Sequence, residues 1–130
     1  MPSLFTRIIR GEIPCYKIAE DDYCIAFLDI FPLKEGHTLV VPKKEVDHWI
    51  DLDPETQSHL IQFAQRIGKA IQSVTGSDRI GLVIAGFEIP HTHIHLIPVN
   101  EMNEMNFSNP KIQLTEERFK ELASLISSQL

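Results

Sequence analysis

Three of the six histidines lie close together, at alternate positions in one short stretch: His91, His93 and His95. Successive side chains of a β-strand point to opposite faces, so an extended backbone here would place all three imidazoles on one side. Neutral imidazole is a good nucleophile toward phosphorus at pH 7, and neighbouring imidazole groups can donate to phosphoryl oxygens. The spacing therefore predicts a site that acts on a phosphate-bearing anion.

Two other interpretations of this row are a metal site and a solvated polar face on an edge strand. At about 3.3 Å per residue, the Cα atoms of His91 and His95 would lie about 13 Å apart, whereas a zinc–nitrogen bond is about 2.0–2.1 Å. No Cys-x-x-Cys, His-x-x-x-His or His-Glu-x-x-His motif completes a ligand set. We expect no metal and no cofactor, and a histidine–metal enzyme is the less favoured alternative.

Size and composition indicate one soluble globular domain. The chain has 130 residues, of which 43% are hydrophobic and 23% charged. Its net charge of -6 argues against a nucleic-acid polymer as partner, because such binding depends on neutralising phosphates, but a small nucleotide is compatible with it. Cys15 and Cys24 form no disulfide framework, and neither a signal peptide nor a membrane-spanning stretch is visible. We expect a cytoplasmic protein without a membrane partner.

Hydrophobic periodicity and turn residues predict an α+β fold with a mainly antiparallel sheet of about five strands. Asp53-Pro54-Glu55 is typical of a helix start and Gly76 of a helix end, which predicts one long central helix between them. Shorter helices are expected after Ser3 and from Thr115. The strands are expected over residues 16–20, 23–29, 37–41, 79–85 and 91–99. Residues 79–85 are apolar on both faces, which predicts burial on both sides or pairing with another chain.

The segment His91-Thr92-His93-Ile94-His95-Leu96-Ile97 matches the His-φ-His-φ-His-φ-φ signature, in which φ is hydrophobic, with Thr92 at the first φ. Together with Ile8–Pro14, Glu20–Asp22, Ala26–Ile30 and Gly36–Lys43, it resembles the Hint-like branch of the histidine triad (HIT) family over roughly residues 3–100. The resemblance implies a HIT-like fold. We expect a single HIT domain over residues 1–130, comprising a HIT core (1–100), a linker (101–114) and a C-terminal helix (115–130).

The resemblance also implies a nucleotide hydrolase or nucleotidyl transferase. It would cleave a nucleoside 5′-phosphate derivative, such as one of AMP, at the α-phosphorus. By position, His93 would be the nucleophile that forms a covalent nucleotidyl-histidine, and His91 and His95 would contact the phosphate oxygens. His37 would be a fourth site histidine and Asp29 would hold the ribose. The base pocket would be lined by Phe5, Ile8, Ile13, Phe27, Ile30 and Leu39. Members of the family also form homodimers through a strand and the central helix, so a homodimer is expected.

Three positions depart from the family pattern. Where many members have asparagine, glutamine and a small hydroxyl residue near the phosphate and leaving group, this chain has Ile80, Phe87 and Glu88. These changes leave open an alternative, a nucleotide-binding regulatory protein with weak turnover. Ser3 and Thr6 stand where some bacterial members carry a zinc-binding Cys-x-x-Cys pair, so that metal is not expected.

Overall fold

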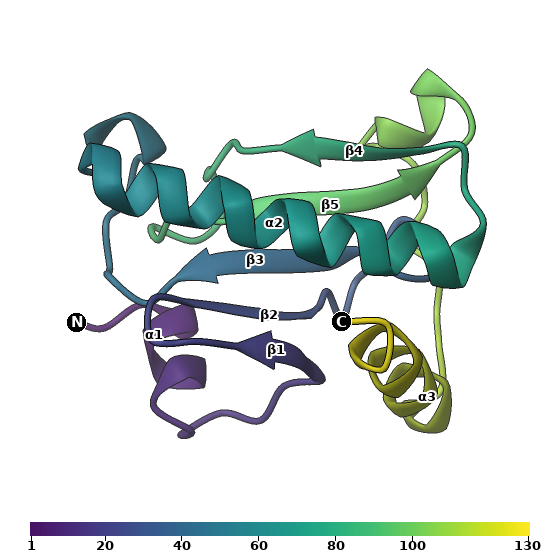
Figure 1. The fold of residues 1–130 in the computed structure, drawn as a ribbon, viewed down its shortest axis with the longest axis horizontal. Coiled ribbons are helices and arrows are strands. Elements are labelled where there is room, and N and C mark those ends of the chain that lie inside the picture. The colour runs from purple at the N-terminus through teal and green to yellow at the C-terminus, as the bar shows by residue number, and fades with distance from the viewer.

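A five-stranded antiparallel sheet forms the centre of the molecule, as the sequence predicts (Figure 1). The computed structural model describes all residues, 1–130. The strands follow the spatial order β1-β2-β3-β5-β4. They comprise β1 (Lys17–Glu20), β2 (Cys24–Leu28), β3 (Thr38–Pro42), β4 (Arg79–Val83) and β5 (Ile94–Val99). The helices are α1 (Leu4–Ile9), α2 (Pro54–Thr75) and α3 (Glu116–Ser127), with short 3-10 turns η1 (Trp49–Asp51) and η2 (Met102–Met105). None of the helices has both the length and the apolar character needed to cross a bilayer.

Each helix begins at the residue that its sequence predicts. The side chains of Ser3, Asp53 and Thr115 accept hydrogen bonds from backbone N–H groups of α1, α2 and α3, respectively. The long helix α2 ends at Gly76, whose φ of 67° is left-handed and favours glycine. The local sequence thus determines the length of α2.

The two faces of the sheet are covered unequally. Alternate residues of each strand point toward α2 and α3, for example Ala26, Val40 and Ile94, and with those helices they form an apolar core of 18 buried residues. In Figure 1, α2 crosses in front of the sheet and α3 lies beside its β1 edge. The opposite face carries the much smaller α1 cluster, which comprises Phe5, Ile25, Phe27, Leu39 and Val41. That second face is where the sheet has room for a site.

The last strand is shorter than expected, because it begins at Ile94 and not at His91. Proline has no N–H to give to a sheet ladder, and Pro90 immediately precedes the histidines. The backbone N–H of Thr92 donates to the carbonyl of Val46 over 2.8 Å, which ties residues 91–93 to the loop after β3. His95 therefore lies within the sheet, opposite Leu39, whereas His91 and His93 belong to the loop that leads into β5.

The strand β4 lies at one edge of the sheet and pairs only with β5. It is not covered on both faces within one chain, since its residues are exposed or half-buried and Leu82 is 44% exposed. Of the two expectations for this segment, burial on both sides is therefore wrong for the single chain. Its unpaired edge leaves room for a partner chain.

Candidate active site

A cavity of about 540 Å³ opens on the face of the sheet that carries the histidines. Parts of the chain that are distant in sequence meet there: the end of β2, the loop before β3, the loop from β4 to β5, the start of β5 and the segment after η2. Its lining residues are Asp29, Phe31, His37, Val83, Ala85, Gly86, Phe87, Glu88, His93, His95, Phe107 and Lys111. Four residues expected to act on a nucleotide thus meet in one cavity: Asp29, His37, His93 and His95.

A backbone carbonyl determines which nitrogen of His93 is free. Its Nδ1 lies 2.8 Å from the carbonyl oxygen of His91, and a carbonyl can only accept, so we assign the ring hydrogen to Nδ1. The Nε2 atom then carries a lone pair. Burial lowers the pKa of His93, which keeps the ring neutral at pH 7. A neutral imidazole with a free Nε2 can act as a nucleophile without a separate base.

His95 is the opposite tautomer of His93. Its tautomer follows from the hydrogen bonds that link Leu33, His37 and His95. The N–H of Leu33 donates to His37 Nδ1 over 3.0 Å, so the neutral His37 ring carries its hydrogen on Nε2. That Nε2 lies 3.0 Å from His95 Nδ1 and donates to it, which leaves the hydrogen of His95 on its own Nε2. Burial, the first cause in each case, lowers the pKa of His37 to about 3 and that of His95 to about 4. His95 is therefore a neutral hydrogen-bond donor.

The rings of His93 and His95 lie side by side, with centroids 5.0 Å apart and planes inclined at 62°. One presents an acceptor nitrogen and the other a donor. This pair can attack a phosphorus atom and at the same time donate to an oxygen bonded to it.

His91 lies outside the cavity lining, in contrast to the expectation that it touches the phosphate. It is completely buried, and its Nε2 donates to the carbonyl of Pro42 over 2.8 Å. Its Nδ1 lies 2.7 Å from the hydroxyl of Ser3, and Thr6 and Glu45 extend this network. Both ring nitrogens are used for these contacts. His91 is thereby placed to anchor the loop whose carbonyl orients His93.

Asp29 lies at the end of β2 with one carboxylate oxygen engaged. Its Oδ1 accepts from the N–H of Phe31 over 2.9 Å, and its Oδ2 lies 3.5 Å from His37 Nε2. Burial raises the pKa of Asp29 to about 6, and the negative charge of Glu88 acts in the same direction. The partly free Oδ2 is an acceptor suited to a hydroxyl group.

Asp29, His37 and His95 each offer one possible metal-ligand atom, and these three atoms lie within 4.8 Å of one another. This spacing is close enough to consider a metal ion. A metal ligand must offer a lone pair, however, and His37 Nδ1 already accepts the N–H of Leu33. Coordination through Nε2 would require the neutral ring to lose its only N–H or to give up that hydrogen bond. The three residues fit a hydrogen-bond chain and do not fit a metal site.

Only some of the residues predicted to line the pocket for the nucleotide base lie together in the structure. Phe5, Phe27 and Leu39 belong to the α1 cluster, and Ile8 packs against it. Phe5 also contacts the loop that leads into β5, with ring centroids 4.9 Å from His93 and 5.9 Å from His91. Ile13 is half-buried outside this cluster and the cavity. Ile30 lines a different cavity, beside α3.

Sequence reasoning missed the contribution of residues 101–114, which it treats as a linker. Phe107 and Lys111 from this segment line the cavity, and the Phe107 ring lies 4.9 Å from that of His95. An aromatic residue in a polar, Asn- and Glu-rich stretch is the one local signal that could have indicated this role.

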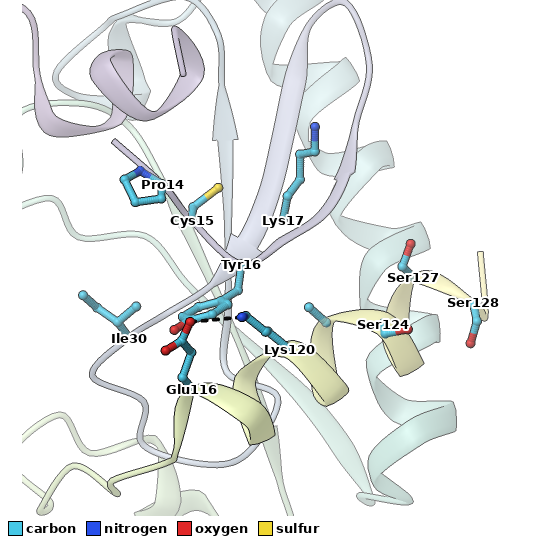
Figure 2. A pocket seen from close by; sticks show the side chains of 11 residues that line it. Pro14, Cys15, Tyr16, Lys17, Ile30, Glu116, Lys120, Ser124, Ser127 and Ser128 are labelled. Carbon is cyan, nitrogen blue, oxygen red and sulfur yellow. Dashed lines mark ion pairs between the residues drawn. The ribbon is translucent and has the colours of Figure 1, made fainter. Parts of the chain in front are cut away.

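A larger cavity, of about 880 Å³, lies between residues 14–17 and α3 (Figure 2). Its charged groups are paired: Lys120 with Glu116 at 3.0 Å, as drawn in Figure 2, and Lys17 with Glu20 at 3.0 Å. Along α3 it presents serine hydroxyls, and it contains no histidine. No activated nucleophile converges there.

Comparisons with known proteins agree with this geometry. Residues 10–102 match the model of the HIT domain. The chain is 32% identical to the adenosine 5'-monophosphoramidase hnt1 of Schizosaccharomyces pombe, over 100% of this chain and 99% of that protein. It is 36% identical to the adenylylsulfatase HINT3 of Arabidopsis thaliana, over 95% of this chain and 66% of that protein.

A solved structure of similar shape is a Hit-like protein from Bartonella henselae, described as involved in cell-cycle regulation. It is 34% identical, with a TM-score of 0.85, and the match covers 98% of this chain and 96% of that one. The HIT domain match spans most of the chain, and the fold agrees with it. This protein belongs to the HIT family.

Proposed function

We propose that this protein hydrolyses or transfers the nucleotidyl group of a nucleoside 5′-phosphate derivative, through a covalent intermediate on His93. The observation that carries the proposal is the opposed polarity of two adjacent rings. His93 offers a lone pair on Nε2 because its Nδ1 bonds to the His91 carbonyl. His95 offers an N–H because His37, itself held by the N–H of Leu33, donates to its Nδ1.

In the first step His93 Nε2 attacks the α-phosphorus and a P–N bond forms. The bond from phosphorus to the leaving group breaks, and the leaving group takes the electron pair and, where it is basic enough, a proton from water. His95 Nε2–H donates to a phosphoryl oxygen as charge develops. The His91 carbonyl, 2.8 Å from His93 Nδ1, stabilises the positive charge that the substituted ring acquires.

In the second step water, or the hydroxyl of an acceptor, attacks the same phosphorus. The P–N bond breaks and its electron pair returns to His93 Nε2, while the attacking group loses its proton to solvent. Water gives a nucleoside monophosphate and hydrolysis, and another acceptor gives transfer. The ring returns to its neutral starting state.

We propose that the nucleotide part of the substrate, to which the leaving group is attached, is AMP-like. Asp29 Oδ2, at the end of an apolar strand, is available for ribose hydroxyls, and Phe5 of the α1 cluster lies beside His93, on the side where we place the base. The two relatives are named for an AMP phosphoramidate and an adenylyl sulfate. Those names share the adenylyl group and differ in what is attached to it, which fits chemistry at the α-phosphorus.

The test is turnover of a fluorogenic adenosine phosphoramidate, with and without a chelator. We expect AMP to be released at a rate that the chelator leaves unchanged. AMP binding without measurable turnover would contradict a hydrolase and favour the regulatory alternative. Activity abolished by the chelator and restored by zinc would contradict a metal-independent reaction.

We also propose a homodimer that forms along β4. Leu82 of this edge strand and Ile61 of α2 are 44% and 49% exposed and line one shallow cavity, where a second copy could cover them. Light scattering should give twice the chain mass of 14.8 kDa. A monomer at micromolar concentration would contradict this.

A further inference from the structure

The segment between β5 and α3 forms a fixed wall of the cavity. Met105 of η2 packs against β4 where Gly81 leaves space, because a Cβ at position 81 would lie 2.1 Å from the Met105 sulfur. Glu104 forms an ion pair with Lys34, and the N–H of Ile112 donates to the carbonyl of Pro32 over 2.9 Å. Contacts on both sides thus hold residues 104–112 against the sheet.

This wall places an aromatic ring next to the reacting groups. The Phe107 ring lies 4.9 Å from that of His95 at an interplanar angle of 74°, and 6.2 Å from that of His37. Lys111 Nζ donates to the carbonyls of Phe107 and Asn109, at 2.5 and 3.3 Å. The lysine therefore fixes the turn that presents Phe107, which remains 39% exposed toward the cavity.

A second ring, that of Phe87, lines the same cavity from the loop between β4 and β5. It is 97% exposed, so this large apolar side chain has almost no packing partner in its own chain. Glu88, next to it, also lines the cavity, which makes this loop unfavourable for a second anionic group. Exposed apolar groups that gather at a cavity mark binding surfaces.

We propose that Phe87 and Phe107 form a leaving-group subsite that selects leaving groups ending in an aromatic ring. The subsite rests on the proposed reaction, because the group it holds is the one that His93 displaces. His95 lies in contact with Phe107, so a group attached to the phosphorus beside His95 reaches this ring directly. Beyond the area it buries, an aromatic pair is worth about 0.5–1.5 kcal/mol, which corresponds to about 2–13-fold in rate or affinity.

The test compares two AMP amidates whose leaving amines differ only in the ring: phenethylamine, which is aromatic, and cyclohexylethylamine, which is saturated. The quantity is the ratio of kcat/KM for the aromatic to the saturated amidate, measured in wild type and variants. Intrinsic reactivity of the two amidates cancels when these ratios are compared. Phe87→Ala removes a side chain that packs on nothing, and Phe107→Leu keeps an apolar group of similar size.

We expect the ratio to fall about fivefold in Phe87→Ala and in Phe107→Leu, and to stay unchanged in Tyr23→Ala. Tyr23 is a matched control, because it is an exposed aromatic residue that lines a different cavity. A ratio within about twofold of wild type in either phenylalanine variant, with both amidates still hydrolysed, would overturn the two-ring subsite. If wild type hydrolysed neither amidate, the proposed function itself would fail, which is a different result.

Discussion

The cavity beside α3 and the cavity that holds the histidines differ in a way that their volumes do not reveal. The cavity beside α3 measures about 880 Å³ and the histidine cavity about 540 Å³. In the larger one, the lysines are paired with neighbouring glutamates at the surface. In the smaller one, the His91 carbonyl fixes the tautomer of His93, and the N–H of Leu33, acting through His37, fixes the opposite tautomer of His95. The capacity of a cavity for catalysis depends on side chains whose tautomers are fixed by hydrogen-bond partners. The volume of a cavity is a poor guide to that capacity.

The largest effect should come from removing the nucleophile. His93→Asn should bind AMP nearly as wild type does and lose at least about a thousandfold in turnover, which corresponds to about 4 kcal/mol of barrier. Ser124→Ala, in the larger cavity, is the matched control and should stay within about twofold of wild type. Steady-state kinetics on the fluorogenic phosphoramidate measures both. If Ser124→Ala were the more damaging change, the comparison between the cavities would be reversed.

An intermediate effect is expected at Asp29. A lost hydrogen bond to a charged group costs about 1.5–3 kcal/mol, so Asp29→Ala should weaken AMP binding by about 10- to 150-fold. The 2′,3′-dideoxy analogue of AMP lacks the hydroxyls and should be affected much less. Calorimetry with both ligands separates a contact with the ribose from a general disturbance of the cavity, which would weaken both equally.

The raised pKa of Asp29 gives this contact a pH dependence. Above its pKa of about 6 the carboxylate is ionised and accepts from both hydroxyls, and below it protonation removes an acceptor. Binding of adenosine, which has no titrating phosphate, should therefore weaken as the pH falls, by up to about tenfold between pH 7 and 5. Asp29→Asn should make the affinity independent of pH over this range. A profile with the same slope in that variant would assign the titration to another group.

The smallest effect should come from His37, which acts through His95. His37→Leu removes the donor to His95 Nδ1, so the neighbouring ring no longer has a fixed tautomer. We expect kcat to fall about tenfold with little change in KM, because the oriented N–H matters most in the transition state. His37→Gln can accept from Leu33 and donate to His95, so it should restore most of kcat. Equal losses in both variants would indicate a packing role.

Local sequence predicts the elements well, because their signals are local. The caps at Ser3, Asp53 and Thr115 and the left-handed Gly76 lie where propensity places them. The strand predicted over residues 91–99, in contrast, is wrong at its start, because β5 begins at Ile94 and both His91 and His93 lie in the loop before it. A strand from His91 assumes a regular ladder, whereas Thr92 bonds to the loop at Val46. That contact spans 46 residues and cannot be inferred from periodicity.

Local sequence also fails to predict all the residues that line the histidine cavity. Residues 101–114 have the polar composition of a linker, and Met105 becomes an anchor only because Gly81 lies beneath it in the folded sheet. Ile30 follows an apolar strand and is predicted to line the pocket for the nucleotide base. The turn after Asp29 instead directs it toward α3. Both outcomes depend on tertiary contacts. The resemblance predicts which histidines act on the substrate, and the hydrogen bonds indicate which tautomer each of them adopts.

The most direct test of the account is a search for the covalent intermediate. Wild-type protein is mixed with the adenosine phosphoramidate, quenched in denaturant during the reaction, digested and examined by mass spectrometry, with His93→Asn treated in parallel. The account predicts one added adenylyl group on the peptide that contains His93, and none on the variant. Rapid turnover with no adduct on any peptide, or an adduct on another residue that persists in His93→Asn, would contradict it.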